Sequence, residues 1–172
     1  MGGFIAASYA ARYPGEVASL WLLDPAGAFS AQPSEMIRRI DAGEPVPLFA
    51  KTPDEFDAVI AFVMTEPPFI PSPIKRVLAD RAAANYDLNH QIFKEIREGS
   101  IPLENLVNGL AVPTRIVWGE QDRVLDVSGA RVLAGLMPAA SVLIMPGIGH
   151  LPMLEAPKAV AEDYRAFRAT LQ

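Results

Sequence analysis

One stretch of the sequence, TRIVWGEQD at residues 114–122, joins a short apolar run to a glycine and an acidic residue. Similar apolar runs occur at Val17–Leu23 and at Ser141–Met145. Short and almost continuous apolar runs are typical of strands that are covered on both faces of a sheet. We therefore predict three parallel strands, with Thr114–Trp118 between the other two.

Segments with the properties of helices accompany these runs. Gly3–Tyr13 is rich in alanine and ends before a Pro-Gly pair, which commonly follows a helix. Val127–Leu136 and Lys158–Leu171 have helical spacing and follow the second and third predicted strands. Because strands and helices alternate in an open α/β sheet, the predicted fold class is α/β.

The segment between Asp24 and Gly109 has a different pattern. Nine of the sixteen prolines of the chain lie from Pro25 to Pro73. They separate short amphipathic stretches near residues 34–42, 53–64, 73–86 and 88–98. We predict that this segment is a helical insertion that adds no strand to the sheet.

The composition of the chain limits its class and its partners. The 172 residues are 51% hydrophobic and 20% charged, which is typical of a globular domain. With a net charge of −5 and no cluster of lysine and arginine, binding to nucleic acid is not expected. No apolar run approaches the ~18 residues that span a bilayer. The absence of cysteine and of a signal-like N-terminus favours a cytoplasmic location but leaves the compartment open.

Two residues are candidates for catalysis. Asp122 and His150 each follow a predicted strand by a few residues and are 28 positions apart. Because the carboxyl ends of parallel strands share one edge of a sheet, both side chains are expected at that edge. Asp122 could accept the Nδ1 proton of His150 and leave Nε2 as a general base, as in a nucleophile triad. Glu120 and Asp126 compete for the role of the acid, and a loop histidine bonded to the backbone is the competing interpretation of His150.

Other polar residues are weaker candidates for a catalytic role. His90 lies in a polar helical stretch and is expected to be solvated. Ser8 falls inside the first predicted helix, away from the sharp turn that activates a serine nucleophile, so we interpret it as a small core residue. The two histidines are 60 residues apart and accompany no acidic helix motif, so no metal site and no cofactor are expected.

Four stretches resemble the α/β-hydrolase family, and within it the monoacylglycerol lipases and bacterial lipases. They are MGGF at residues 1–4, LLDPAG at 22–27, WGEQDRVLD at 118–126 and GHLPMLE at 149–155. The resemblance implies a hydrolase core of residues 1–28 and 109–172, with a helical cap formed by residues 29–108. It also implies that a serine immediately before Met1, in Gly-x-Ser-Met-Gly-Gly, completes a triad with Asp122 and His150.

The resemblance implies two further sites. The residue after the serine, here Met1, would supply one oxyanion donor through its backbone N–H. The cap would cover an acyl pocket, for which Phe62, Met64, Phe69 and Ile70 are candidate walls. Their helical spacing is equally expected for the core of the cap.

The predicted function is that of the C-terminal portion of a serine hydrolase, an esterase or lipase that cleaves a small-molecule acyl ester. The 172 residues alone are expected to be inactive, because the nucleophile and the second oxyanion donor would lie upstream. They are also expected to self-associate through an exposed strand edge at Val17–Leu23. Contact of the cap with a membrane has no support in the sequence. The alternatives are a dehalogenase with an aspartate nucleophile, and a non-catalytic fragment or binding module.

Overall fold

A computed structural model describes residues 1–99 and 101–171. Its centre is a parallel sheet with the order β1-β2-β3, formed by β1 (Leu20–Leu23), β2 (Thr114–Gly119) and β3 (Ala140–Met145). The register aligns Leu20 with Thr114, and Thr114 with Ala140. The α/β fold class, the three strands and their parallel order are therefore confirmed.

The first strand is shorter than predicted. It begins at Leu20, whereas the apolar run begins at Val17. The backbone N–H of Leu20 donates to the carbonyl of Pro113, directly before the first residue of β2. In this register, residues 17–19 would lie opposite residues that come before Thr114, where β2 has not yet begun. Hydrophobicity alone does not reveal this limit.

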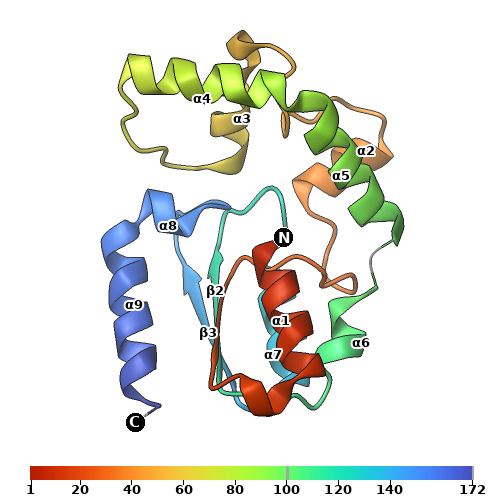
Figure 1. The fold of residues 1–172 in the computed structure, drawn as a ribbon, viewed down its shortest axis with the longest axis vertical. Helices are drawn as coiled ribbons and strands as arrows, with labels where there is room; N and C mark the ends of the chain where they lie inside the picture. Colours follow the sequence, from red (N-terminus) through yellow and green to blue (C-terminus); the bar gives the residue numbers. More distant parts are fainter. Residues whose placement is uncertain (100, 172) are drawn as a thin grey trace.

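Helices cover both faces of the sheet, because alternate residues of each strand point to opposite sides. Leu20, Leu22, Ile116 and Trp118 pack with apolar residues of α1 (Gly2–Arg12), α6 (Leu103–Val107) and α7 (Ser128–Leu136). On the other face, Val117 and Met145 pack with Val160 of α9 (Pro157–Ala169). Figure 1 shows α9 on one side of the sheet and α1 with α7 on the other.

The insertion is helical in its described part. It contains α2 (Glu35–Asp41), α3 (Phe56–Val63), α4 (Ser72–Ala84) and α5 (Tyr86–Gly99), with a 3₁₀ turn at Pro53–Glu55 before α3. These elements lie beyond the carboxyl ends of the strands, like a roof over that edge of the sheet (Figure 1). Among the described residues of the insertion there is no strand, in agreement with the sequence prediction.

Among the described residues, apolar side chains of the insertion pack against the rest of the fold at two places. Met36 and Phe62 of the insertion pack with Val124 from the loop after β2, so this loop is part of the core of the cap. The short helix α6, which the sequence analysis did not predict, packs Leu103 and Val107 into the main core beside α1 and α7. The cap is therefore anchored both on the loop that follows β2 and on the main core.

Two short elements complete the described structure. A 3₁₀ turn, Pro14–Glu16, follows α1, and α8 (Pro152–Glu155) follows the loop after β3. Across the described ranges, the helices lack the combination of length and apolar character needed to traverse a bilayer.

Candidate active site

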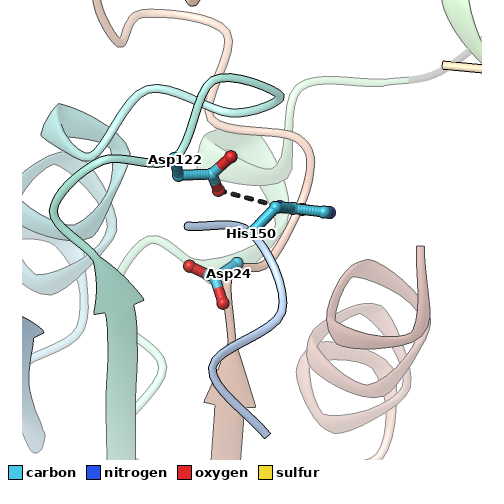
Figure 2. A group of neighbouring side chains, drawn as sticks. All are labelled: Asp24, Asp122 and His150. Atoms are coloured by element: carbon cyan, nitrogen blue, oxygen red, sulfur yellow. Dashed lines mark hydrogen bonds and ion pairs between the residues drawn. The ribbon is translucent and has the colours of Figure 1, made fainter. Parts of the chain in front are cut away.

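Asp122 and His150 lie together at the carboxyl edge of the sheet, on the loops after β2 and β3. His150 Nδ1 is 2.8 Å from Asp122 Oδ2, and the Asp122 side chain is fully buried. The contact through Nδ1 is the one that the sequence analysis expected. Figure 2 shows that the far side of the imidazole points away from Asp122. Within the described residues, the hydrogen bonding of the ring is through Nδ1, so the geometry leaves Nε2 available to a reacting group.

The backbone fixes the orientation of the Asp122 carboxylate. Its Oδ1 accepts hydrogen bonds from the N–H groups of Val124, at 2.8 Å, and Leu125, at 3.0 Å. Its other oxygen is therefore directed to His150. The pattern is that of an acid which orients an imidazole and stabilises the imidazolium form.

The competing candidates for the acid have other environments. Asp126 Oδ1 accepts a hydrogen bond from the backbone of Ser128, at the start of α7, and Glu120 is exposed. Asp122 is therefore the carboxylate that holds His150 in this structure. His90 is exposed on α5, and Ser8 lies inside α1, as the sequence suggested for both.

The His150 loop is tied to the cap through backbone hydrogen bonds. His150 N–H donates to the carbonyl of Val63 at 2.8 Å, at the end of α3. The Glu155 carboxylate accepts from Gly149 at 3.0 Å and from Thr65 at 2.7 Å. It also accepts from Leu151 and Glu66. Glu155 therefore joins the histidine loop to the segment that follows α3, a role that the sequence analysis did not assign.

Two glycines allow the loops to approach each other. A Cβ atom on Gly119 would overlap the carbonyl oxygen of Gly149, and it would lie 2.5 Å from the carbonyl oxygen of Ile148. A Cβ atom on Gly149 would lie 2.9 Å from the backbone of Thr65 and of Val63. Only a residue without a side chain fits at either position, which is why the stretches around the acid and the histidine each contain a glycine.

A third carboxyl group, Asp24, lies beside the pair and was not among the predicted site residues. It directly follows β1, is 4% exposed and has a φ of +40°. Its Oδ1 accepts a hydrogen bond from Gly119 N–H at 2.9 Å. Burial raises the pKa of Asp24 to about 9, and repulsion from Asp122 adds to the increase. An acidic residue directly after a predicted strand was the available signal, since the same rule located Asp122.

These three residues also have the donor types of a metal site. One potential ligand atom from each of Asp24, Asp122 and His150 lies within 4.8 Å of the others. However, His150 Nδ1 and both oxygens of Asp122 already take part in hydrogen bonds. A metal ion would have to replace these bonds, so the arrangement fits an acid and base pair better than a metal site.

An apolar cavity of about 800 Å³ lies between the core and the cap. Its lining includes Met1 and Phe4 at the start of α1, Phe29, and Phe93 of α5. A smaller and more polar cavity of about 510 Å³ lies on the Asp122 side and is lined by Asp122 and Arg38. Asp126 borders both cavities, so they meet the same loop after β2.

The four candidate acyl-wall residues do not gather at the large cavity. Phe62 is buried in the core of the cap, and Met64 is buried and lines the smaller cavity. Phe69 is 91% exposed, and Ile70 is half-buried. Their helical spacing was equally compatible with the wall of an acyl pocket and with the core of the cap. Phe62 lies in the core of the cap.

Comparisons with known proteins identify relatives of the chain. The chain is 34% identical to Lipase 1 of Psychrobacter immobilis over 173 residues, which are 100% of this chain and 54% of that protein. It is 32% identical to monoacylglycerol lipase ABHD6 of Homo sapiens over 179 residues, 99% of this chain and 53% of that protein. The chain thus spans about half the length of these curated relatives.

A solved structure is similar over the same region. The crystal structure of a membrane phospholipase A, described as a bacterial virulence factor, has a TM-score of 0.93 and 43% identity. The match covers 98% of this chain and 54% of that chain. Residues 1–157 also match the family model described as alpha/beta hydrolase fold. The fold, the relatives and the family model lead to one conclusion: this chain belongs to the α/β-hydrolase fold family.

Proposed function

We propose that the chain is the C-terminal portion of a carboxylic ester hydrolase in which Asp122 and His150 are two members of a Ser-His-Asp triad. The observation that carries the proposal is the 2.8 Å hydrogen bond from His150 Nδ1 to a buried carboxylate. The serine would come from outside these 172 residues, directly before Met1. The proposal that the serine lies outside these residues is supported by the length of the lipase relatives, which are about twice as long as the matched region.

In this mechanism His150 moves the proton. Nε2 accepts the hydroxyl proton of the serine as the serine oxygen attacks the ester carbonyl, and it then protonates the alcohol that leaves. Water releases the acid from the acyl-enzyme by the same sequence of proton transfers. Asp122 keeps Nδ1 protonated and stabilises the imidazolium that forms in each half of the reaction.

Met1 is the proposed source of one oxyanion donor. Within a longer polypeptide its nitrogen is a backbone N–H at the start of α1, an eleven-residue helix. Unpaired N–H groups and the helix dipole favour negative charge at such an end. In Figure 1 this end of α1 lies at the carboxyl edge of the sheet, below the cap.

The acyl chain of the ester is proposed to occupy the 800 Å³ cavity, whose lining is mostly apolar. The cavity extends from Met1 and Phe4 to Leu125 and Asp126, so it connects the proposed oxyanion donor with the loop that holds Asp122. Phe29 and Phe93 replace the four sequence candidates as proposed acyl-wall residues, because they line this cavity.

Hydrolysis of p-nitrophenyl esters tests the proposed function. The complete polypeptide, meaning the full translation product of the gene that encodes residues 1–172, is expected to hydrolyse the ester in a His150-dependent manner. Residues 1–172 alone are expected to be no faster than their His150→Ala variant, because removing the nucleophile and one oxyanion donor costs several orders of magnitude in rate. Saturable turnover by residues 1–172 that depends on His150 would contradict the proposal and place the nucleophile inside this chain.

We also propose that residues 1–172 associate with one another when they are separated from the rest of the polypeptide. Among the described strands, β1 pairs on one side only, with β2, and its other edge is open. Beside it, α1 exposes Met1, Ile5 and Tyr9 by 60%, 59% and 47%. An open strand edge next to exposed apolar side chains recruits other chains.

Light scattering after size exclusion tests this proposal. It is expected to show oligomers for residues 1–172 and a defined species for the complete polypeptide. A monodisperse monomer of residues 1–172 would contradict the proposal.

A further inference from the structure

Asp24 is the least explained group of the site. It is 4% exposed, yet Oδ2 has no hydrogen-bond partner within the described residues. The carboxyl groups that face it are Asp122 on the loop after β2 and Glu155 on α8, both of which repel a negative charge at Asp24. Figure 2 shows Asp24 beside the Asp122 and His150 pair, at the end of a neighbouring strand.

We propose that Asp24 is a positioning residue that holds the loop of Asp122 as a neutral carboxylic acid. Oδ1 accepts the Gly119 N–H at 2.9 Å, and the proton of the acid would lie on Oδ2, which is buried and has no partner among the described residues. Gly119 ends β2 three residues before Asp122, so this bond fixes the point at which the Asp122 loop leaves the sheet. The catalytic meaning of this role rests on the proposed function, but the protonation state does not.

The neutral form follows from the surroundings of the carboxyl group. A buried carboxylate loses its hydration, and a second carboxylate within 4.8 Å raises the cost of ionisation further. Burial and the negative charge of Asp122 raise the pKa of Asp24 to about 9, against the effect of the Gly119 hydrogen bond. At neutral pH the site therefore carries the charge of Asp122 without a second charge at Asp24.

Ionisation of Asp24 would disturb the pair. The new charge requires water or a cation, and a carboxyl group that moves toward solvent releases the Gly119 N–H. The start of the Asp122 loop is then no longer held, and the Asp122 to His150 contact loosens. We therefore expect an alkaline limit of the site, centred near the pKa of Asp24 of about 9.

The informative replacement at this position is Asp24→Asn. Asparagine keeps a carbonyl oxygen for Gly119 N–H, carries no charge at any pH and tolerates a φ of +40° better than other non-glycine residues. Alanine would remove the acceptor and strain the backbone together, so it could not separate the two effects. Asp126→Asn is the matched control, because Asp126 lies on the same loop and faces Ser128 instead.

The test is an NMR titration of the complete polypeptide with ¹³C-labelled aspartate and ¹⁵N-labelled histidine. The Asp24 carboxyl carbon is expected to keep the shift of a protonated acid from pH 5 to pH 8 and to titrate near pH 9. In Asp122→Asn the transition is expected at lower pH, because the repelling charge is gone. The His150 signals are expected to change in the same alkaline range in the wild type and in Asp126→Asn, but not in Asp24→Asn. His90 serves as the internal reference.

Stability provides a second readout that needs no assignment of signals. The folded pKa of Asp24 lies above its ordinary value of 3.8, so the folded protein retains a proton that the unfolded chain releases. The free energy of unfolding is therefore expected to fall between about pH 4 and pH 9, and Asp24→Asn is expected to remove this part of the decline. Titration of Asp24 below pH 6, or identical pH profiles of wild type and Asp24→Asn, would overturn the proposal. Neither readout needs ester hydrolysis, so loss of the proposed function would leave this test intact.

Discussion

Asp122→Asn is expected to lower kcat for ester hydrolysis by the complete polypeptide about ten-thousand-fold, with little change in stability. Oδ1 of Asp122 already accepts two backbone N–H groups, so the oxygen of asparagine must take that place. The amide NH₂ group then faces His150 Nδ1 as a donor. A donor there forces Nδ1 to accept, which moves the imidazole proton to Nε2 and removes the general base.

Steady-state kinetics with a soluble ester would measure this effect. Glu120→Gln is the control, since Glu120 lies on the same loop as Asp122, is exposed and does not touch the imidazole. It is expected to retain activity within about tenfold, which corresponds to about 1.4 kcal/mol in the barrier. Equal losses in the two variants, or an Asp122→Asn enzyme within tenfold of the wild type, would show that Asp122 is not the acid of a triad.

Gly119→Ala is expected to destabilise the protein by more than about 3 kcal/mol, because the new methyl group would overlap backbone atoms of the histidine loop. The obstructing groups are the carbonyl oxygens of Gly149 and Ile148. These groups are held in place, since Ile148 accepts the N–H of Gln121 and Gly149 donates to Glu155. The overlap can therefore be relieved only if the loops after β2 and β3 separate. This separation would also break the contact between Asp122 and His150.

Denaturant unfolding monitored by circular dichroism would measure the loss. Gly135→Ala is the matched control, because Gly135 lies within α7 and a Cβ atom there would meet no atom within 4 Å. This variant is expected to be as stable as the wild type or up to about 1 kcal/mol more stable, from helix propensity. Similar midpoints for Gly119→Ala and the wild type would contradict the described packing of the two loops.

The parts of the fold that follow from periodicity could be predicted from the sequence. The nearly continuous apolar runs at Thr114–Trp118 and Ser141–Met145 identified β2 and β3, because a strand with helices on both faces of its sheet carries apolar residues on both sides. The beginning of β1 could not be predicted this way. It depends on where β2 begins, at Thr114 after Pro113, and so on a contact between segments that are about ninety residues apart.

The same distinction applies to the site. Asp122 and His150 could be paired in advance, because parallel strands place their following loops at one edge of the sheet. Asp24 follows a strand too, but its importance arises from burial and from the proximity of Asp122, which only the folded chain reveals. Phe62 and Phe69 were indistinguishable in the sequence, although one is buried and the other is 91% exposed.

We propose that Asp122 and His150 serve a serine that lies outside these 172 residues. Labelling of the complete polypeptide with a fluorophosphonate probe, followed by mass spectrometric mapping of the adduct, tests it most directly, because such probes react with a serine that a neighbouring base activates. A single adduct is expected on the serine directly before Met1, and this adduct is expected to be lost in His150→Ala. An adduct on a serine within residues 1–172, or labelling that persists in His150→Ala, would contradict it.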